Sequence, residues 1–249
     1  KRMKDELTKR RFEDLADKAF KSNHYTFTSF LTEAELSEFY TIKHLSPPSY
    51  TIWGGRENAD RVMIRFRDPE ELGYTEEFPI KCVAIEPLSK KFAEELTHRD
   101  FLGCLMNLGI KRSETGDIIV NEKAAYVFCT EKMAEYICSE ITRVRHTVVT
   151  CRITEELPES TGSEPSSLEI QAASERIDGV ISKIFHLSRS NCSELFREKK
   201  IFVNGRLNEN SSYLLKEEDK ISVRGFGKFI FKGISGTTRK GNKIITIDL

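Results

Sequence analysis

Apolar residues recur at helical spacing at the start of the chain and at strand spacing soon after it. Over residues 4–21 one face of an amphipathic helix is predicted to be buried, formed by Leu7, Phe12, Leu15, Ala19 and Phe20. Thr32 is expected to cap a second helix, with Glu35 completing a capping box. Strands at Tyr50–Trp53 and Arg61–Phe66 follow, around a pair of glycines. Residues 1–72 are therefore predicted to form a small α/β domain.

Residues 78–154 alternate between strand and helix patterns in the order βαββαβ. The elements are predicted at Ile80–Glu86, His98–Leu108, Asp117–Val120, Ala125–Cys129, Glu131–Ile141 and Thr147–Ile153. This order is typical of a four-stranded antiparallel sheet with two helices on one face, the ferredoxin-like or RRM-like fold. The whole chain is accordingly predicted to be α+β.

The third strand of this middle domain carries two aromatic residues, Tyr126 and Phe128. RNA-recognition domains of this shape stack bases on aromatic side chains of their central strands. The strand lacks the K/R-G-F/Y-G/A-F pattern of those domains, so packing into a core is the favoured interpretation. Base stacking on this sheet is the alternative.

A change of composition marks the boundary of a third domain. The stretch from Glu155 to Ser167 is rich in Pro, Ser, Thr and acidic residues, so residues 155–170 are predicted to be a linker. Residues 171–249 then show two helical patterns, at Arg176–His186 and Arg189–Glu198. A strand at Ile201–Val203 follows and runs into a tight turn at Asn204-Gly205.

Composition narrows the class of protein, and charge points to the last third of the chain. The 249 residues are 39% hydrophobic and 31% charged, with six cysteines and no C-x-x-C pair, which predicts a folded cytoplasmic protein with reduced thiols and no membrane insertion. The formal net charge is zero. Residues 173–249 nevertheless carry 15 basic and 9 acidic residues, a net +6, which leaves −6 for the rest. Such an asymmetry is typical of a basic module for an anionic partner.

The second helix of this basic module sorts its side chains by type. At 100° per residue, Arg189, Arg197 and Lys200 project onto one arc beside the apolar stripe, where they would meet adjacent phosphates. Ser188 is the expected N-cap, and its helix end attracts anions through free backbone N–H groups. RNA binding is one interpretation of this edge, and a solvated helix with incidental charge is the other.

The string RID-x9-SRSNCSELFREKKIFVNGR closely resembles the RNA-binding domain named after small-subunit ribosomal protein S-four, with its two-helix alpha-L motif. Cys192 stands at the usual alanine position, and Lys199 stands where a glycine normally ends the second helix. Because glycine reaches left-handed backbone angles without strain, Lys199 implies a local cost or an altered turn.

The segments Arg99–Val120 and Arg224–Ile244 extend the resemblance to the bacterial YlmH family. The resemblance implies a short N-terminal domain, an RRM-like middle domain and a C-terminal S-four domain. It also implies binding to ribosomal RNA of the large ribosomal subunit, with tRNA as a further partner, during rescue of stalled nascent chains. The genes of this family often lie beside cell-division genes.

Pattern and resemblance together predict an RNA-binding edge and a second RNA contact. The edge consists of Arg176, Ser188, Arg189, Ser190, Arg197, Lys199, Lys200, Asn204, Arg206, Arg224, Lys228, Arg239 and Lys240. Of these, Arg239 and Lys240 lie on a predicted hairpin tip at residues 237–242. Asp178 is expected to be a structural partner of a nearby cation or a helix-end charge, and not an RNA contact. The second contact would use Arg99, Lys111 and Arg112, for which a solvated loop is the alternative.

No motif of the chain indicates catalysis. P-loop, H-E-x-x-H and G-x-S-x-G signatures are absent, and the histidines lack metal-ligand spacing. His98-Arg99-Asp100 is a polar cluster, interpreted as a helix cap rather than as general acid/base equipment. We expect a non-enzymatic RNA-binding protein without metal, cofactor or small-molecule substrate. The alternatives are a cell-division-linked scaffold that acts through protein partners and an RNA-modifying enzyme anchored by the S-four domain.

Overall fold

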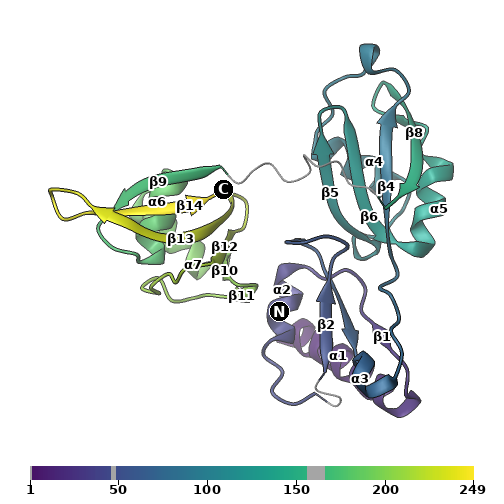
Figure 1. The fold of residues 1–249 in the computed structure, drawn as a ribbon, viewed down its shortest axis with the longest axis horizontal. Helices are drawn as coiled ribbons and strands as arrows, with labels where there is room; N and C mark the ends of the chain where they lie inside the picture. Colours follow the sequence, from purple (N-terminus) through teal and green to yellow (C-terminus); the bar gives the residue numbers. More distant parts are fainter. Residues whose placement is uncertain (1, 46–48, 156–165) are drawn as a thin grey trace. The chain divides into compact units, whose positions relative to one another are not determined.

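The structure, a computed structural model, describes residues 2–45, 49–155 and 166–249. It divides the chain into two compact units, Lys1–Thr161 and Gly162–Leu249, and each is described by itself (Figure 1). Both units combine helices with antiparallel sheets, so the predicted α+β class is confirmed. Among the described residues, no helix is long and apolar enough to cross a membrane.

The first part of unit 1 consists of a three-stranded sheet and three helices. Its strands are β1 (Thr26–Phe27), β2 (Tyr50–Trp53) and β3 (Met63–Phe66), in the order β1-β3-β2. Its helices are α1 (Arg2–Ser22), α2 (Glu33–Phe39) and the short α3 (Pro69–Leu72). Thr32 caps α2 with Glu35 in the predicted capping box. The core joins the helices to the sheet through Phe12, Phe39 and Phe66.

The buried stripe of α1 differs from the predicted one. Phe12 and Ala19 are buried, together with Ala16, but Leu7 is 60% exposed and Phe20 is 59% exposed. At 100° per residue Leu7 points about 140° away from Phe12, which places it on the solvent side of the helix. The strand β3 also begins two residues later than predicted, because Arg61 is held by groups outside this sheet.

The second part of unit 1 is a five-stranded sheet with two helices on one face. Its elements are β4 (Ile80–Pro87), η1 (Lys90–Phe92), α4 (His98–Asn107), η2 (Arg112–Glu114), β5 (Thr115–Asn121), β6 (Ala124–Thr130), α5 (Glu131–Glu140), β7 (Arg143–Val144) and β8 (Thr147–Thr154). The strand order is β5-β6-β4-β8-β7, all antiparallel, which is that of the split βαβ arrangement with one added edge strand. Four strands were predicted, and β7 is the fifth because residues 143–148 turn back as a short hairpin.

The two faces of this middle sheet bury different partners. One face packs on α4 and α5 through Phe101, Leu105 and Ile137. The opposite face packs on the N-terminal part, where Phe30 and Met63 meet Tyr126 and Phe128. Tyr126 is 7% exposed and Phe128 is 2% exposed, so the aromatic residues of β6 are core residues. Packing, the favoured interpretation of these aromatics, is confirmed, and the predicted domains 1–72 and 78–154 lie together in one unit.

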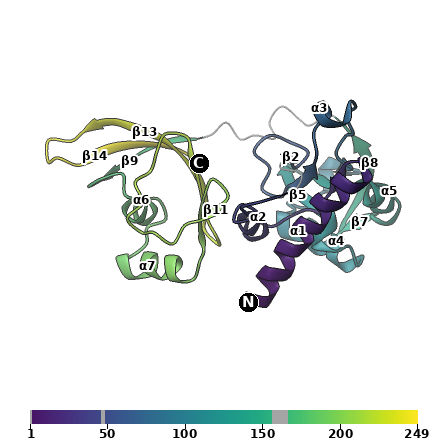
Figure 2. The same ribbon diagram turned by 90° about the horizontal axis from the view of Figure 1, so that it is seen from below.

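Unit 2 is a six-stranded antiparallel sheet with two helices against one of its faces (Figure 2). The helices are α6 (Ile177–Ile184) and α7 (Arg189–Arg197). The strands are β9 (Ser167–Ala172), β10 (Ile201–Val203), β11 (Arg206–Leu207), β12 (Asp219–Val223), β13 (Gly227–Thr237) and β14 (Lys243–Asp248), in the order β11-β10-β12-β13-β14-β9. The core between helices and sheet includes Ile177, Ile181, Leu195 and Phe231.

Three local predictions for unit 2 need correction. The strand β9 pairs with β14 from Ser167 onwards, so the sheet begins inside the predicted linker 155–170, of which residues 156–165 lie outside the described part. Helix α7 ends at Arg197, with Glu198 as its C-cap, one residue before the predicted end. The hairpin tip predicted at residues 237–242 is one residue shorter, because Thr237 still pairs with Lys243 in the sheet.

Candidate nucleic-acid interface

A pocket of about 520 Å³ lies between α6 and α7 and is lined by two of the predicted RNA-binding residues, Arg176 and Arg189. Arg176 precedes α6, Lys183 lies in its last turn, and Arg189 opens α7. All three line the pocket, together with Asp178. Arg189 is exposed, so its guanidinium is accessible to an anion. The pocket therefore carries three cations against one carboxylate.

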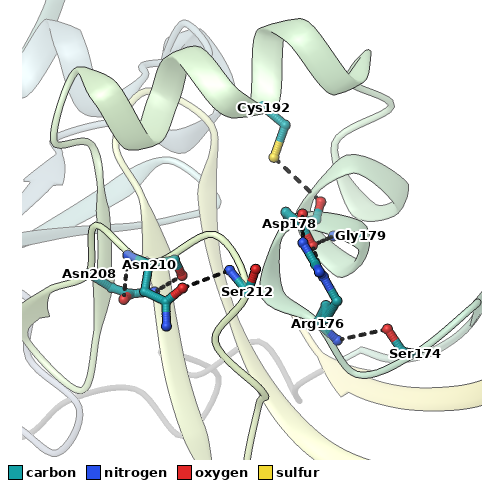
Figure 3. A network of polar contacts seen from close by, with 8 residues as sticks. All are labelled: Ser174, Arg176, Asp178, Gly179, Cys192, Asn208, Asn210 and Ser212. Carbon is teal, nitrogen blue, oxygen red and sulfur yellow. Dashed lines mark hydrogen bonds and ion pairs between the residues drawn. The ribbon is translucent and has the colours of Figure 1, made fainter.

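Arg176 and Asp178 form a two-point ion pair at this pocket (Figure 3). The arginine donates from Nε at 3.2 Å and from Nη2 at 2.7 Å to the two carboxylate oxygens of Asp178. These hydrogen bonds hold the pKa of Asp178 below its usual range, and the backbone N–H of Gly179 adds a third at 2.8 Å. Cys192 of α7 donates its thiol to the carbonyl oxygen of Asp178 at 3.4 Å. The expected structural role of Asp178 is confirmed, and Arg176 is bound to it in a forked geometry.

The N-terminus of α7 has the predicted cap. Ser188 Oγ accepts a hydrogen bond from Asn191 N at 3.2 Å and lies 2.9 Å from Ser190 Oγ. The cap fixes the direction of the first helical turn and hence the place where Arg189 leaves the backbone. Ser188, Arg189 and Ser190 are all exposed.

The other cations of this region have acidic partners on the surface. Arg197 pairs with Glu194 at 2.8 Å, Lys199 pairs with Glu209 at 2.9 Å, and Lys200 pairs with Glu198 at 2.7 Å. The projected helical arc is wrong for Lys200, because α7 ends at Arg197 and the chain reverses at Lys199, whose φ is 59°. Exposed ion pairs are each worth only about 0–1 kcal/mol, so a phosphate competes readily for these side chains.

The side-chain amide of Asn204, predicted to bind RNA, forms hydrogen bonds within the turn region after β10. Asn204 has a φ of 52° and donates from Nδ2 to Asp219 Oδ1 at 2.8 Å. Its Oδ1 accepts from Lys220 N at 2.9 Å. Both ends of the amide are therefore engaged within unit 2. The neighbouring Arg206 is exposed at the start of β11.

The remaining predicted residues occupy two turns at opposite ends of β13. Arg224 and Lys228 are exposed around the β12–β13 turn, where Arg224 N donates to Lys200 O at 2.9 Å. Arg239 and Lys240 are exposed on the β13–β14 hairpin tip. Because β13 runs from Gly227 to Thr237, the two turns lie about 30 Å apart along the strand. The structure thus brings Lys200 and Arg224 together and separates Arg239 and Lys240 from them.

The three residues predicted to form a second RNA contact in the middle domain differ in exposure. Arg99 and Lys111 are exposed, whereas Arg112 is half-buried. Arg112 Nη1 donates to Thr115 Oγ1 at 2.8 Å and to Gly116 O at 3.1 Å, and burial lowers its pKa. Arg112 therefore stabilises its own loop. Arg99 lines a separate pocket of about 450 Å³ together with Arg143 and Arg145.

Sequence reasoning missed the polar centre that joins the two halves of unit 1. Asp117 is buried and accepts hydrogen bonds from Arg56 Nε at 3.1 Å, Asp60 N at 3.0 Å and Arg61 N at 3.0 Å. Arg61 in turn donates to Thr115 O at 2.9 Å and Arg112 O at 2.8 Å, and burial lowers its pKa to about 10. These contacts link residues more than 50 positions apart, so no local pattern reveals them. Residues 55–61 are thus a structural clamp.

The cluster His98-Arg99-Asp100 is a helix cap, as expected. Asp100 Oδ2 accepts from Thr97 N at 2.8 Å and from Thr97 Oγ1 at 2.7 Å. All six cysteines are free, and burial raises the pKa of Cys82, Cys129 and Cys151 to about 12, so these thiols stay protonated at neutral pH. Within the described part of the chain, no group of three His, Cys, Asp or Glu residues is placed to hold a metal ion.

Comparison with known proteins assigns the middle of the chain to a family. Residues 74–156 match the family described as the putative RNA-binding domain in YlmH. The middle domain is similar to the RNA-binding domain of the YlmH family. The predicted resemblance to the YlmH family is thereby confirmed, whereas the S-four resemblance of the C-terminal unit stays a prediction.

Two known proteins are similar to parts of this chain. The ribosome-associated protein quality control protein P2 of Bacillus subtilis (strain 168) is 28% identical over 203 residues, which cover 78% of this chain and 76% of the relative. The solved structure of the cell division protein ylmH from Streptococcus pneumoniae aligns with a TM-score of 0.44 and 21% identity. That alignment covers 61% of this chain and 91% of the other.

Proposed function

We propose that this protein binds ribosomal RNA through the α6–α7 edge of unit 2 and acts in ribosome-associated quality control of stalled nascent chains. Two findings support the proposal: the YlmH-type RNA-binding domain at residues 74–156 and the similarity to a ribosome-associated quality control protein. In this proposal the protein is an adaptor on the large subunit in the cytoplasm and catalyses no reaction of its own.

The observation that carries the proposal is the pocket between α6 and α7. Arg176, Lys183 and Arg189 line it, and Ser188 presents the capped N-terminus of α7 beside them. A phosphodiester backbone needs cations at the spacing of adjacent phosphates. Arg189 offers forked donors and Lys183 a mobile point charge, while the fork of Arg176 is held by Asp178. Such contacts recognise the shape and charge of the folded RNA and position the protein on it. They do not read the base sequence of the RNA.

Unit 1 would reach a second partner from a different surface than an ordinary RNA-recognition domain. The sheet face that stacks bases in those domains is closed here by the N-terminal part. Its exposed cations Arg99 and Lys111 lie outside that closed face, on α4 and on the loop before η2. We therefore assign any tRNA contact to these loops and helices and not to the sheet.

The double variant Arg189→Ala with Arg197→Ala tests the proposal. Both side chains are exposed and neither is part of the core, so the melting temperature should stay nearly unchanged. Loss of two phosphate contacts should abolish co-sedimentation with ribosomes at about 150 mM salt. Co-sedimentation and a thermal melt of the same preparation measure the two effects.

Lys216→Ala with Lys232→Ala is the matched control, because it removes the same charge from exposed positions of unit 2 away from the pocket. The control variant should keep ribosome binding. Retained binding in the Arg189/Arg197 variant would contradict the proposal and favour a protein partner. A collapse of its melting temperature would instead show that those arginines are structural.

A further inference from the structure

Phe226 is held out of the core by the turn that joins β12 to β13. Val223 pairs with Gly227 across the hairpin, which leaves Arg224, Gly225 and Phe226 as a three-residue loop. Gly225 has a φ of 89° and Gly227 a φ of 149°, angles that a side chain would strain. The ring of Phe226 is 47% exposed. The backbone N–H of Phe226 donates to Val223 O at 2.9 Å, and this hydrogen bond holds the aromatic residue in the turn.

The ring is supported from below by other aromatic side chains. Phe185 packs against Phe226 with ring centroids 5.7 Å apart and an interplanar angle of 55°. Phe185 also packs against Phe229, which is buried in the core, at a centroid distance of 6.3 Å. One side of the exposed ring is therefore buttressed, so a second flat group that stacks on its free side would need little ordering.

The turn lies next to the elements proposed to bind phosphates. Phe185 is the C-cap of α6, and only three residues separate it from Arg189, the first residue of α7. On its other side the turn is tied to the end of α7 by the hydrogen bond from Arg224 N to Lys200 O. Arg224 and Lys228 flank the ring along the chain, and both are exposed.

We propose that Phe226 is a stacking platform for an unpaired base of the RNA whose backbone lies along α7. Single-stranded nucleic acid is bound by this combination, in which aromatic rings stack bases while cations follow the backbone. A single exposed apolar residue is ordinary on a protein surface. Here the fixed turn, the aromatic support and the flanking cations together distinguish Phe226 from such a residue. The inference rests on the proposed RNA-binding function and names the RNA feature that it recognises.

Two variants of the full chain separate stacking from mere contact. Phe226→Leu keeps an apolar side chain but removes the π-face, and Phe226→Tyr keeps the ring. Phe226→Leu should weaken ribosome binding about 5- to 150-fold, and Phe226→Tyr should bind like the unchanged protein. Equal binding by all three proteins would overturn the proposal, as would equal weakening of both variants with unchanged melting temperatures.

A fluorescent reporter gives a second test that does not depend on the Leu variant. The chain has one tryptophan, Trp53, so Trp53→Phe combined with Phe226→Trp places the only indole at the proposed platform. A ten-nucleotide oligoadenylate should quench its emission, and a blunt RNA duplex of equal length should not. Absence of quenching by oligoadenylate, or equal quenching by the duplex, overturns the proposal.

The salt dependence of ribosome binding distinguishes this inference from the proposed function. Phe226→Leu removes no charge, so log K should fall while its slope against log salt stays unchanged. Arg189→Ala should make that slope shallower by about 0.7–0.9. A shallower slope with Arg189→Ala, together with an unchanged log K for Phe226→Leu, would keep the proposed function and reject the stacking site. No binding and no salt dependence in the unchanged protein would reject the proposed function itself.

Discussion

Lys199 occupies a backbone conformation that glycine adopts most easily. Its φ is 59°, and it reverses the chain directly after the C-cap of α7. The resemblance to the S-four domain places a glycine at this position, and the sequence left open whether lysine would alter the turn. The structure keeps the left-handed turn with lysine in it. A residue with a side chain is strained in this left-handed conformation. The lysine places a cation in the turn, and its Nζ pairs with Glu209.

Lys199→Gly should therefore stabilise unit 2 while removing a charge. Relief of the left-handed strain should raise the free energy of unfolding by about 0.5–1 kcal/mol. Urea denaturation followed by circular dichroism measures the change. Lys199→Ala is the control, because it removes the same charge and keeps the strain. If the Gly variant is no more stable than the Ala variant, the backbone at this position is not strained.

At the scale of elements, the clamp around Asp117 explains why the middle sheet is covered. Its carboxylate accepts from Arg56 and from the backbone of Asp60 and Arg61, and this fixes the loop 54–61 over the start of β5. A Cβ at Gly55 would lie 2.4 Å from Phe128 Cδ1, so the absence of a side chain there allows the loop to approach the sheet. The close approach completes the burial of the β6 aromatics.

Asp117→Ala should loosen the N-terminal part from the middle sheet. Two backbone N–H groups and a half-buried guanidinium would lose their acceptor, which should cost about 2–4 kcal/mol of unfolding free energy. Urea denaturation measures the loss, and faster trypsin cleavage in the loop 54–61 reports where the structure opens.

Glu57→Ala is the matched control for this clamp, because Glu57 is an exposed carboxylate in the same loop. It should change the stability by less than about 0.5 kcal/mol. An equal loss in both variants would mean that Asp117 contributes only its charge and not its specific hydrogen bonds.

The helices and strands of this chain were predictable where the hydrophobic periodicity is strong. The tertiary contacts between them were not. The order of strands and helices over residues 80–154 follows from alternation and amphipathic spacing, with ends within two residues of the observed ones. The prediction for Leu7 is wrong because this residue projects about 140° from Phe12 and therefore does not belong to the stripe. The Asp117 clamp was missed because its partners are distant in sequence.

The candidate site was predictable in outline for the same reason. The cap at Ser188 and the exposed Arg189 follow from local signals that the structure retains. The ion pairs of Arg197 and Lys200, the internal amide of Asn204 and the separation of Arg239 from Arg224 depend on chain reversals. A helical projection does not apply to residues beyond the end of the helix. The predicted position of Lys200 is wrong for this reason, because α7 ends at Arg197.

On the scale of the whole molecule, the formal net charge is zero although the C-terminal third of the chain is basic. Residues 173–249 carry a net charge of +6, and the remaining residues balance it. An anionic polymer responds to the local potential within about one Debye length, roughly 8 Å at physiological salt, and not to the total. The basic unit can therefore dock on RNA although the protein as a whole is neutral.

The most direct test of RNA docking is a titration of ribosome binding against salt concentration. If about five phosphates are neutralised, log K should fall against log salt with a slope of about −3.5 to −4.5. In Arg189→Ala the slope should be shallower by about 0.7–0.9, because one phosphate contact is lost. A flat salt response of the unchanged protein, or an identical slope for Arg189→Ala, would contradict docking through the α6–α7 edge.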